Sequence, residues 1–381
     1  MKVLVVFGTR PESIKMIPVV RALRAETSVQ VEICVTAQHR QMLDQVLALF
    51  GERPDYDLDI MTAAQGLTGI TCAVLEGLDD VLARSKPDRV LVHGDTTTTL
   101  ATSLACYYRR VPVGHVEAGL RSGDPLQPWP EENNRRITDV IADQMFAPTP
   151  SARANLRAEG VDGRRIFLTG NTVVDALLAT LAMIDGDGAR RAALEQQFDF
   201  LDPDRPVLLV TAHRRENFGQ PFRDLCGAIA ELARAHRLQV VFPVHLNPNV
   251  QAPVNAILAG QPGVHLIAPL DYLPFVYLMR RAHVILTDSG GIQEEAPSLG
   301  KPVFVMRRVT ERPEAVDAGV VKLVGTDRAR IVAEVSSILT DRSRYEAMSR
   351  RQNPYGDGRA SARIAAVVAG RACEEWAGAA P

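Results

Sequence analysis

Short apolar runs alternate with stretches of helical length along nearly the whole chain. The first run, VLVVFG at 3–8, is rich in β-branched residues and leads through a Gly-containing turn into a helical pattern. Runs this apolar predict strands buried on both faces of a parallel sheet, with a crossover helix between successive strands. The same pattern predicts further strands at 31–37, 89–95, 113–118 and 144–148 and, after a break, at 165–170, 207–213, 240–245, 264–270, 283–290, 302–307 and 320–325.

The two series of strands predict two doubly wound α/β domains. Right-handed crossovers wind each series into an open sheet, and 381 residues are too many for one ordinary core. We place the boundary near Gly170, which gives domains at 1–168 and 169–359. A turn cluster, NPYGDG, begins at Asn353. The apolar helix expected at about 360–376 is predicted to pack back on the first domain.

The composition is that of a globular protein with little net charge. Apolar residues make up 46% of the chain and charged residues 23%. The 43 basic and 45 acidic side chains leave a formal charge of −2. No global field therefore favours nucleic acid or an anionic membrane as a partner, and any anion binding must be local.

Five cysteines lie far apart in the sequence, without a C-x-x-C pair. This spacing predicts reduced thiols rather than a zinc site or a disulfide framework. The chain starts directly with a strand and holds no apolar run long enough to cross a bilayer. We therefore expect a cytoplasmic protein.

Polar side chains gather at the carboxyl ends of the predicted strands. Ligands of open α/β sheets bind outside these ends, where the strand order reverses. Two such sheets facing each other would bring the side chains to one cleft. The residues concerned are Arg10, Gln38, His39, Asp95, Glu117, His213, His245, Asp288 and Ser289.

Three cations point to a bound diphosphate. Arg10 and Lys15 lie at a helix start that lacks the G-x-G-x-x-G fingerprint, and Arg312 follows a later strand. An arginine fork suits the paired oxygens of a diphosphate.

The stretch DSGGIQEEAPSLGKP, at 288–302, has the composition of an anion site. Ser289, Gly290 and Gly291 bring backbone N–H groups to the start of a helix, where unpaired donors and the helix dipole both favour an anion. Glu295, one turn further along, is suited to accept hydrogen bonds from a ribose diol.

Candidate acids and bases come from four separate segments. Asp95 ends VLVHGD, Glu117 lies in HVEAGLRS, Glu131 opens EENNRRITD and His213 follows VLLVTA. No H-E-x-x-H pattern occurs, and H-V-E at 115–117 lacks the P-C-x-x-C of zinc deaminases, so neither a catalytic metal nor another cofactor is expected. A Ser/His/Asp hydrolase is not expected either, because no G-x-S-x-G elbow occurs. Carboxylates and a histidine working beside a nucleotide diphosphate remain.

Several of these motifs together resemble one enzyme family, the non-hydrolysing UDP-N-acetylglucosamine 2-epimerases. The resemblance runs nearly end to end and rests on GTRPESIKMIPV, VHGDTTTTLA, HVEAGLRS, PEENNRRITD, TAHRRENFG and TDSGGIQEEAPSLGKP. It implies a GT-B-like fold, in which two Rossmann-type domains face a central cleft. It also implies a homodimer that converts UDP-N-acetylglucosamine into UDP-N-acetylmannosamine and feeds cell-surface polysaccharide synthesis.

The resemblance also assigns residues. It implies that the catalytic groups are Asp95, Glu117, Glu131 and His213. It implies that the nucleotide is held by Arg10, Lys15, Leu270, Phe275, Ser289, Gly290, Gly291, Glu295 and Arg312.

A second, activating site for UDP-N-acetylglucosamine is implied near Gln38, His39 and Gln41. The family pattern there includes an arginine just before the glutamine that matches Gln65, and this chain has Ala64 instead. We hypothesise that activation by substrate is weak or absent because that cation is missing. A strongly sigmoidal dependence of rate on substrate concentration would count against this hypothesis.

Elimination is the route that suits these residues. The C2 proton of the sugar is not next to a carbonyl group, so departure of UDP from C1 must first make it acidic. We expect Asp95 and Glu131 to remove and return the proton. We expect Glu117 to orient the sugar or stabilise the cationic ring, and His213 to position or protonate the diphosphate. Alternatives are a hydrolysing 2-epimerase, which releases UDP and N-acetylmannosamine, a GT-B glycosyltransferase and a non-catalytic nucleotide-sugar sensor.

Overall fold

The computed structural model describes residues 1–38, 40–62, 65–310 and 312–378. Contacts divide the chain into two compact units, Met1–Leu178 with Tyr355–Gly378, and Ala179–Pro354. The first boundary therefore lies within helix α7 (Thr172–Asp185), after the position near Gly170 where the sequence placed it. The start of α7 belongs to the first unit because the Asp175 carboxylate accepts hydrogen bonds from the backbone of Ala360 and Ser361.

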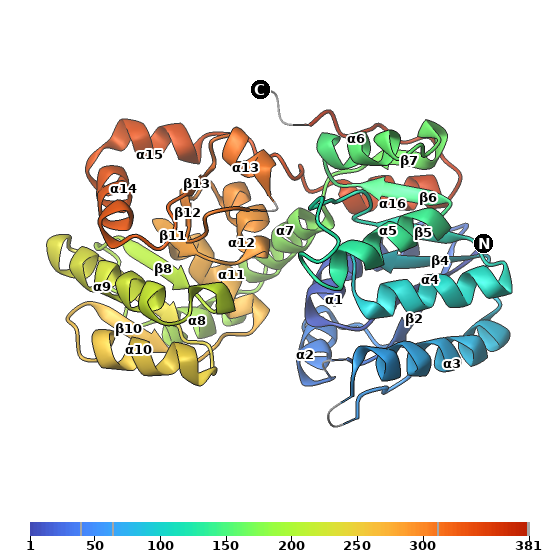
Figure 1. Ribbon diagram of the computed structural model, residues 1–381, viewed down its shortest axis with the longest axis horizontal. Coiled ribbons are helices and arrows are strands. Elements are labelled where there is room, and N and C mark those ends of the chain that lie inside the picture. Colours follow the sequence, from blue (N-terminus) through green and yellow to red (C-terminus); the bar gives the residue numbers. More distant parts are fainter. Residues whose placement is uncertain (39, 63–64, 311, 379–381) are drawn as a thin grey trace. The chain divides into compact units, whose positions relative to one another are not determined.

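The first unit is built on a parallel sheet of seven strands in the order β3-β2-β1-β4-β5-β6-β7 (Figure 1). Its strands are β1 (Lys2–Phe7), β2 (Gln30–Val35), β3 (Tyr56–Asp57), β4 (Arg89–His93), β5 (Val113–Val116), β6 (Gln144–Ala147) and β7 (Ile166–Leu168). Its other helices are α1 (Arg10–Arg24), α2 (Arg40–Phe50), α3 (Leu67–Ser85), α4 (Thr97–Arg109), α5 (Glu131–Ile141), α6 (Pro150–Ala158) and α16 (Ala360–Val368). A 3₁₀ turn, Gly163–Arg165, precedes β7.

The second unit repeats this plan with six parallel strands in the order β10-β9-β8-β11-β12-β13. They are β8 (Val207–Thr211), β9 (Gln239–Pro243), β10 (Val264–Ile267), β11 (Val284–Thr287), β12 (Val303–Val305) and β13 (Val321–Leu323). The helices are α8 (Gly188–Gln197), α9 (Gln220–Ala235), α10 (Pro248–Leu258), α11 (Tyr272–Arg281), α12 (Gly290–Glu295), α13 (Pro313–Asp317), α14 (Arg328–Thr340) and α15 (Arg342–Ser349). Two 3₁₀ turns lie at Arg215–Asn217 and Ala296–Leu299.

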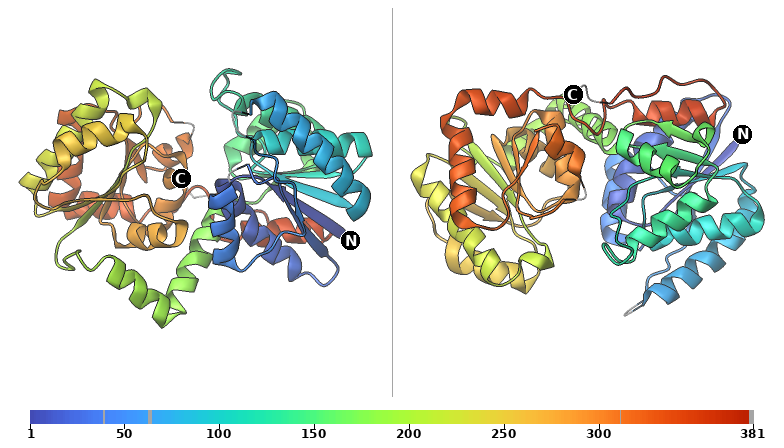
Figure 2. Two further views of the ribbon diagram at one scale, coloured as in Figure 1. Left: turned by 90° about the horizontal axis from the view of Figure 1, so that it is seen from below. Right: turned by 45° about the horizontal axis from the view of Figure 1, so that its top comes forward.

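Helices cover both faces of each sheet (Figure 2). In the first unit α3, α4 and α5 pack side by side, while α1 packs against α2 and α16. The apolar runs fill the layers between, since β1 alone buries residues 3–7 almost completely. Strands buried on both faces explain why they read as continuous apolar runs rather than alternating ones. The prediction of two doubly wound parallel sheets is confirmed.

The strands and the last helix are shorter than the sequence predicted. The polar residues expected to close each strand lie in the following loops, and the two-residue strand β3 was not predicted because its run is too short to show a period. Helix α16 ends at Val368 rather than near residue 376, because Gly370 adopts a left-handed φ of 73° just beyond it. Within the described ranges no helix is long and apolar enough to cross a membrane.

The strand order places two switch points. In the first sheet the order reverses between β1 and β4, and in the second between β8 and β11. Loops that leave neighbouring strands in opposite directions open a crevice at such a point, which is where open α/β sheets bind ligands. Within each unit, predicted site residues that bind a ligand should therefore lie at that edge of the sheet.

Candidate active site

The loop from β1 to α1 is locked to the loop from β4 to α4 through one buried carboxylate. Glu12 accepts hydrogen bonds from the backbone of Thr9 at 2.8 Å and from the Thr96 hydroxyl at 2.8 Å. Thr9 in turn caps α1, so the pair forms a capping box. Burial raises the pKa of Glu12, and these hydrogen bonds oppose that rise. Arg10, the first residue of α1, is therefore presented at the switch point of the first sheet.

Two predicted site residues form one buried ion pair. The Lys15 ammonium donates to the Glu117 carboxylate, which also accepts from the Asn171 amide at 2.8 Å. Glu117 follows β5 and has a φ of 69°, a left-handed conformation that costs a non-glycine residue free energy. Lys15, which the sequence assigned to the diphosphate, thus pairs with the catalytic candidate Glu117 within the first unit.

Asp95 follows β4 and is held from α5. Its carboxylate accepts a hydrogen bond from Arg135 at 2.5 Å, and its backbone carbonyl accepts one from Asn134 at 2.9 Å. The Asp95 side chain is still 27% exposed, so one side of the carboxylate remains accessible. Sequence reasoning missed Asn134 and Arg135, although both lie in the quoted motif PEENNRRITD.

The two glutamates at the start of α5 differ in their surroundings. Glu131 is half-buried at the first position of the helix. Glu132 is buried and accepts from the backbone of Ser122 at 2.9 Å and from Arg136 at 3.0 Å. Burial raises the pKa of Glu132, but the Ser122 backbone and Arg135 outweigh it and hold the pKa below its usual value. Glu132 therefore anchors the loop before α5, and Glu131 stays the catalytic candidate of the two.

His93 lies beside Glu117 as a neutral ring. Its Nε2 is 3.7 Å from a carboxylate oxygen of Glu117, and neither ring nitrogen has a hydrogen-bond partner among the described residues. Burial lowers the pKa of His93 to about 3; the carboxylate of Glu117 opposes this fall, while Lys15 and His115 add to it. His93 therefore adds no charge to the site near neutral pH.

The buried His93 predicts acid sensitivity of folding. Between its folded pKa of about 3 and its ordinary 6.5, the unfolded chain binds a proton at this residue and the folded chain does not. The contribution of His93 to the free energy of unfolding is complete above its ordinary pKa. It falls by about 3 kcal/mol between pH 7 and pH 4. Between pH 7 and pH 4 the free energy of unfolding of His93→Gln should therefore fall by about 3 kcal/mol less than that of the unaltered protein. Urea unfolding at both pH values measures this difference. His236→Gln, at a partly exposed histidine, is the control; equal losses in both variants would contradict the assignment.

In the second unit, Asp288 organises the loop after β8. Its carboxylate accepts from the backbone N–H groups of His213 at 2.9 Å and of Arg214 at 2.8 Å. The His213 ring stacks on that of His245, with centroids 5.4 Å apart. Partial burial lowers the pKa of His213, with Asp288 opposing the fall and His245 and Arg214 adding to it. Asp288 thus holds the backbone that presents His213.

The Gly-rich turn lies between two guanidinium groups. A side-chain carbon added at Gly290 would lie 3.9 Å from a nitrogen of Arg214 and 3.9 Å from one of Arg312. Arg312 itself donates to the Glu294 carboxylate, which is buried. Gly290 and Gly291 begin α12, directly after Ser289. Two guanidinium groups therefore flank the Gly-rich turn, and a side-chain carbon added at Gly291 would meet no atom of the described segments around it within 4 Å. Sequence reasoning did not assign Arg214 to this turn.

The remaining nucleotide-binding candidates, Leu270, Phe275 and Glu295, are close to the Gly-rich turn in the sequence of the second unit. Glu295 is buried and accepts a hydrogen bond from the Tyr272 hydroxyl at 2.7 Å. Burial and the neighbouring Glu295 raise the pKa of Tyr272 well above its usual value, so the phenol remains a donor. Leu270 and Phe275, just before and within α11, are half-buried.

The candidates for an activating site lie around the start of α2. Gln38 is half-buried in the loop after β2, and its side-chain oxygen has no hydrogen-bond partner in the described part of the chain. Gln41 is exposed on the first turn of α2. His39 and Ala64 lie outside the described residues.

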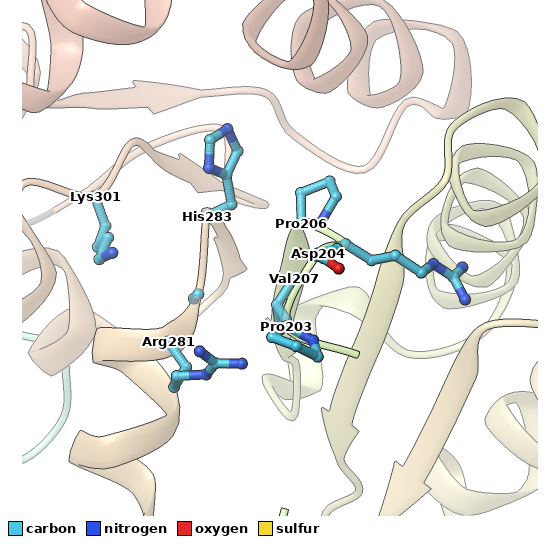
Figure 3. Close-up of a pocket in the computed structure, with 9 residues that line it drawn as sticks. Pro203, Asp204, Pro206, Val207, Arg281, His283 and Lys301 are labelled. Carbon is cyan, nitrogen blue, oxygen red and sulfur yellow. The ribbon is translucent and has the colours of Figure 1, made fainter. Parts of the chain in front are cut away.

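One cavity of the second unit, of about 300 Å³, lies away from these residues (Figure 3). Its lining includes Val207, which begins β8, and His283, which precedes β11, together with Arg281 and Lys301. These positions are at the amino ends of the strands, whereas His213 and Ser289 follow the carboxyl ends. The cavity is therefore separate from the predicted nucleotide site.

Comparison with known proteins decides the family. A family model described as UDP-N-acetylglucosamine 2-epimerase matches residues 21–369. The chain belongs to that family. The UDP-N-acetylglucosamine 2-epimerase of Escherichia coli K12 is 60% identical over 365 residues, which cover 96% of this chain and 97% of the relative. The enzyme of Neisseria meningitidis serogroup A is 51% identical, covering 95% and 97%. The family predicted from the motifs is thus confirmed.

Solved structures of UDP-N-acetylglucosamine 2-epimerases share the fold. That of the Neisseria meningitidis enzyme bound to UDP-GlcNAc is 50% identical, with a TM-score of 0.91 over 97% of this chain and 99% of that chain. The Methanocaldococcus jannaschii enzyme in complex with UDP-GlcNAc and UDP is 34% identical, with a TM-score of 0.81 over 97% and 99%. MurG of Acinetobacter baumannii, at 13% identity and a TM-score of 0.57, shares the fold alone. The GT-B-like fold class is therefore confirmed.

Proposed function

We propose that the protein interconverts UDP-N-acetylglucosamine and UDP-N-acetylmannosamine without hydrolysing them, and that it serves cell-surface polysaccharide synthesis. The observation that carries the proposal is its 50% identity over almost its full length to an epimerase solved with UDP-GlcNAc bound. The carboxylates that follow β4 and β5 support it, because a sensor of nucleotide sugars has no need of them.

The first half of the reaction is an elimination. The C1–O bond breaks, its electron pair leaves with UDP, and positive charge develops on the sugar ring. Donors that meet the growing negative charge on the diphosphate supply the kind of stabilisation that usually dominates catalysis. We assign this role to Arg10, Lys15, Arg312 and the backbone of Ser289, Gly290 and Gly291, with Leu270, Phe275 and Glu295 holding the rest of the nucleotide.

A carboxylate then takes the C2 proton, and the electron pair of the broken C2–H bond forms the C1=C2 double bond of 2-acetamidoglucal. Return of a proton to the opposite face of C2, with re-addition of the UDP oxygen at C1, gives the manno epimer. We assign the two proton transfers to Asp95 and Glu131 without assigning faces. Glu117, held by Lys15 and Asn171, orients the sugar or stabilises its charge. His213 positions or protonates the diphosphate.

An NMR experiment in D₂O separates this proposal from its rivals. UDP-N-acetylglucosamine is incubated with the protein while deuterium at C2, epimer formation and free UDP are followed together. Deuterium at C2 in both epimers, with UDP retained in the sugar nucleotide, is the expected result. Free N-acetylmannosamine with stoichiometric UDP would show a hydrolysing epimerase instead. Inversion without uptake of deuterium would overturn the elimination route, and no change would leave a transferase or a sensor.

Dimerisation, substrate activation and a cytoplasmic location stay predictions. For a homodimer we propose the face formed by α4 and α5, which pack against each other and expose apolar side chains. Those side chains, with their exposed fractions, are Tyr107 at 64%, Tyr108 at 69%, Ile137 at 46% and Val140 at 81%. Exposed apolar groups gathered on one face are typical of an interaction surface.

A further inference from the structure

The buried His115, two residues before Glu117, lies between two hydrogen-bond acceptors. The side chain of His115 is fully buried in β5. Its Nε2 lies 2.7 Å from the carbonyl oxygen of Gly94, and its Nδ1 lies 2.7 Å from a carboxylate oxygen of Asp139. A carbonyl oxygen only accepts hydrogen bonds, so Nε2 must carry a proton.

The second ring nitrogen faces an ionised carboxylate. Burial by itself raises the pKa of Asp139, but His115 and Arg121 outweigh it and hold the pKa below its usual value. Asp139 accepts from Arg121 at 2.8 Å and from the backbone N–H of Gly119 at 3.2 Å. A guanidinium and a backbone N–H therefore both donate to Oδ2, which favours the ionised carboxylate whatever the state of His115. An ionised carboxylate is acceptor-only, so Nδ1 must donate to Oδ1 and carries a proton as well. Both nitrogens are then donors, which is the imidazolium form.

We propose that Asp139 keeps His115 as a buried imidazolium, and that this pair acts as a positioning device for the two turns that carry Asp95 and Glu117. The inference rests on the proposed function, because it concerns residues assigned there to the chemistry.

The hydrogen bonds tie both turns to one point. The ring of His115 holds the carbonyl of Gly94, the residue directly before Asp95. Asp139 holds the backbone N–H of Gly119, two residues after Glu117. Gly94, with a φ of 66°, also donates its own N–H to the Val116 carbonyl, so the two turns are joined directly too. A shift of either turn would move one carboxylate relative to the other.

The left-handed backbone of Glu117 is a conformation that needs such support from its surroundings. Glu117, with a φ of 69°, is held in a conformation that costs about 1–3 kcal/mol for a non-glycine residue and persists only when its surroundings enforce it. The buried charges around it alternate in sign, with Lys15 and His115 positive and Glu117 and Asp139 negative. Arg121 adds a further positive charge at Asp139, and His93 stays neutral. Each buried charge is therefore paired, as burial requires.

The first test is the protonation of the ring in the unaltered protein. In ¹⁵N spectra of histidine-labelled protein near neutral pH, both ring nitrogens of His115 are expected to carry protons, assigned by loss of the signals in His115→Gln. A ring with one unprotonated nitrogen would overturn the proposal. This measurement needs no turnover, so it stays readable even if the proposed reaction is wrong.

The second test uses Asp139→Asn, which keeps the size of the side chain and removes its charge. We expect the spectrum of a neutral ring and a fall in kcat of about 10- to 100-fold, since a displacement of about 1 Å in a reacting group has that effect. The KM should change by less than about threefold, because no group that binds the substrate is removed.

Asp143→Asn is the matched control. Asp143 is likewise paired with an arginine, Arg89 at 2.5 Å, and lies just beyond α5, the helix that contains Asp139. It should leave kcat unchanged. His115→Gln, which removes the imidazolium that bridges Gly94 and Asp139, replaces Asp139→Asn if that variant does not fold. Wild-type kcat in the tested variant, or a loss confined to KM, would overturn the positioning role. Absence of epimerisation in the unaltered protein would instead refute the proposed function.

Discussion

Asp95→Asn is expected to lower turnover of UDP-N-acetylglucosamine by about 10²- to 10⁴-fold, the range typical of a lost general acid or base. The amide cannot take the C2 proton, whereas the backbone around it should persist, since Asn134 holds the Asp95 carbonyl rather than the side chain. UDP affinity should change little because the diphosphate is assigned to other groups. Turnover and C2 deuteration are measured by NMR, and UDP affinity by calorimetry.

A matched control for this variant is Asp79→Asn. Asp79 accepts a hydrogen bond from Arg109 at 2.5 Å, the same length as the bond between Arg135 and Asp95, but lies on the exposed surface of α3. Its replacement removes an arginine pair without touching the proposed site. If Asp95→Asn turned over substrate at the rate of this control, Asp95 would have no part in proton transfer.

Lys15→Met is expected to lower both stability and turnover. The Lys15 and Glu117 side chains are only 11% and 9% exposed, so removing the ammonium takes the positive charge of Lys15 away from a buried carboxylate. Breaking one side of a buried pair costs about 3–5 kcal/mol, and the Asn171 amide that remains on Glu117 places the loss toward the lower end. Urea unfolding measures the stability, and the epimerisation rate measures the effect on catalysis.

The double variant Lys15→Met, Glu117→Gln tests whether the lost stability comes from the broken ion pair. Removing both charges should recover much of the stability lost in the single variant, because no buried charge is left unpaired. The rate should not recover, since both groups are assigned to the reaction. Lys2→Met, at the more exposed pair with Glu32 at 3.1 Å, should cost little. Additive losses in the double variant would show that the two groups do not stabilise each other.

The fold was predictable from the sequence because parallel strands buried on both faces consist of short, continuous runs of apolar residues. VLVVFG at 3–8 and VLLVTAH at 207–213 each contain a central strand of a sheet, β1 and β8. The ends of the elements were less accurate. Polar residues such as Asp95 and His213 were read into the strands, but they leave the ladder for loops that hydrogen bonds from distant segments hold in place.

The sequence supplied the residue types of the candidate site, which stay predictions, but few of the partners that hold them. The capping box of Thr9 and Glu12 has a recognisable spacing in TRPE, but it was not predicted. Arg135 and Arg214 stand inside motifs that were recognised, but a guanidinium near Asp95 or near Gly290 has no local signal. Their roles depend on which helix or loop comes to lie beside the strand ends.

The sequence by itself determined the family, the two doubly wound sheets and the set of polar residues that follow the strands, because each of these is recorded in short runs and fixed spacings. The tertiary structure alone decided that Lys15 pairs with Glu117, which is 102 residues away, and that His115 meets both Gly94 and Asp139. Charge state and partner depend on burial and on contacts between distant segments, and neither property exists in the chain until the sheet has formed.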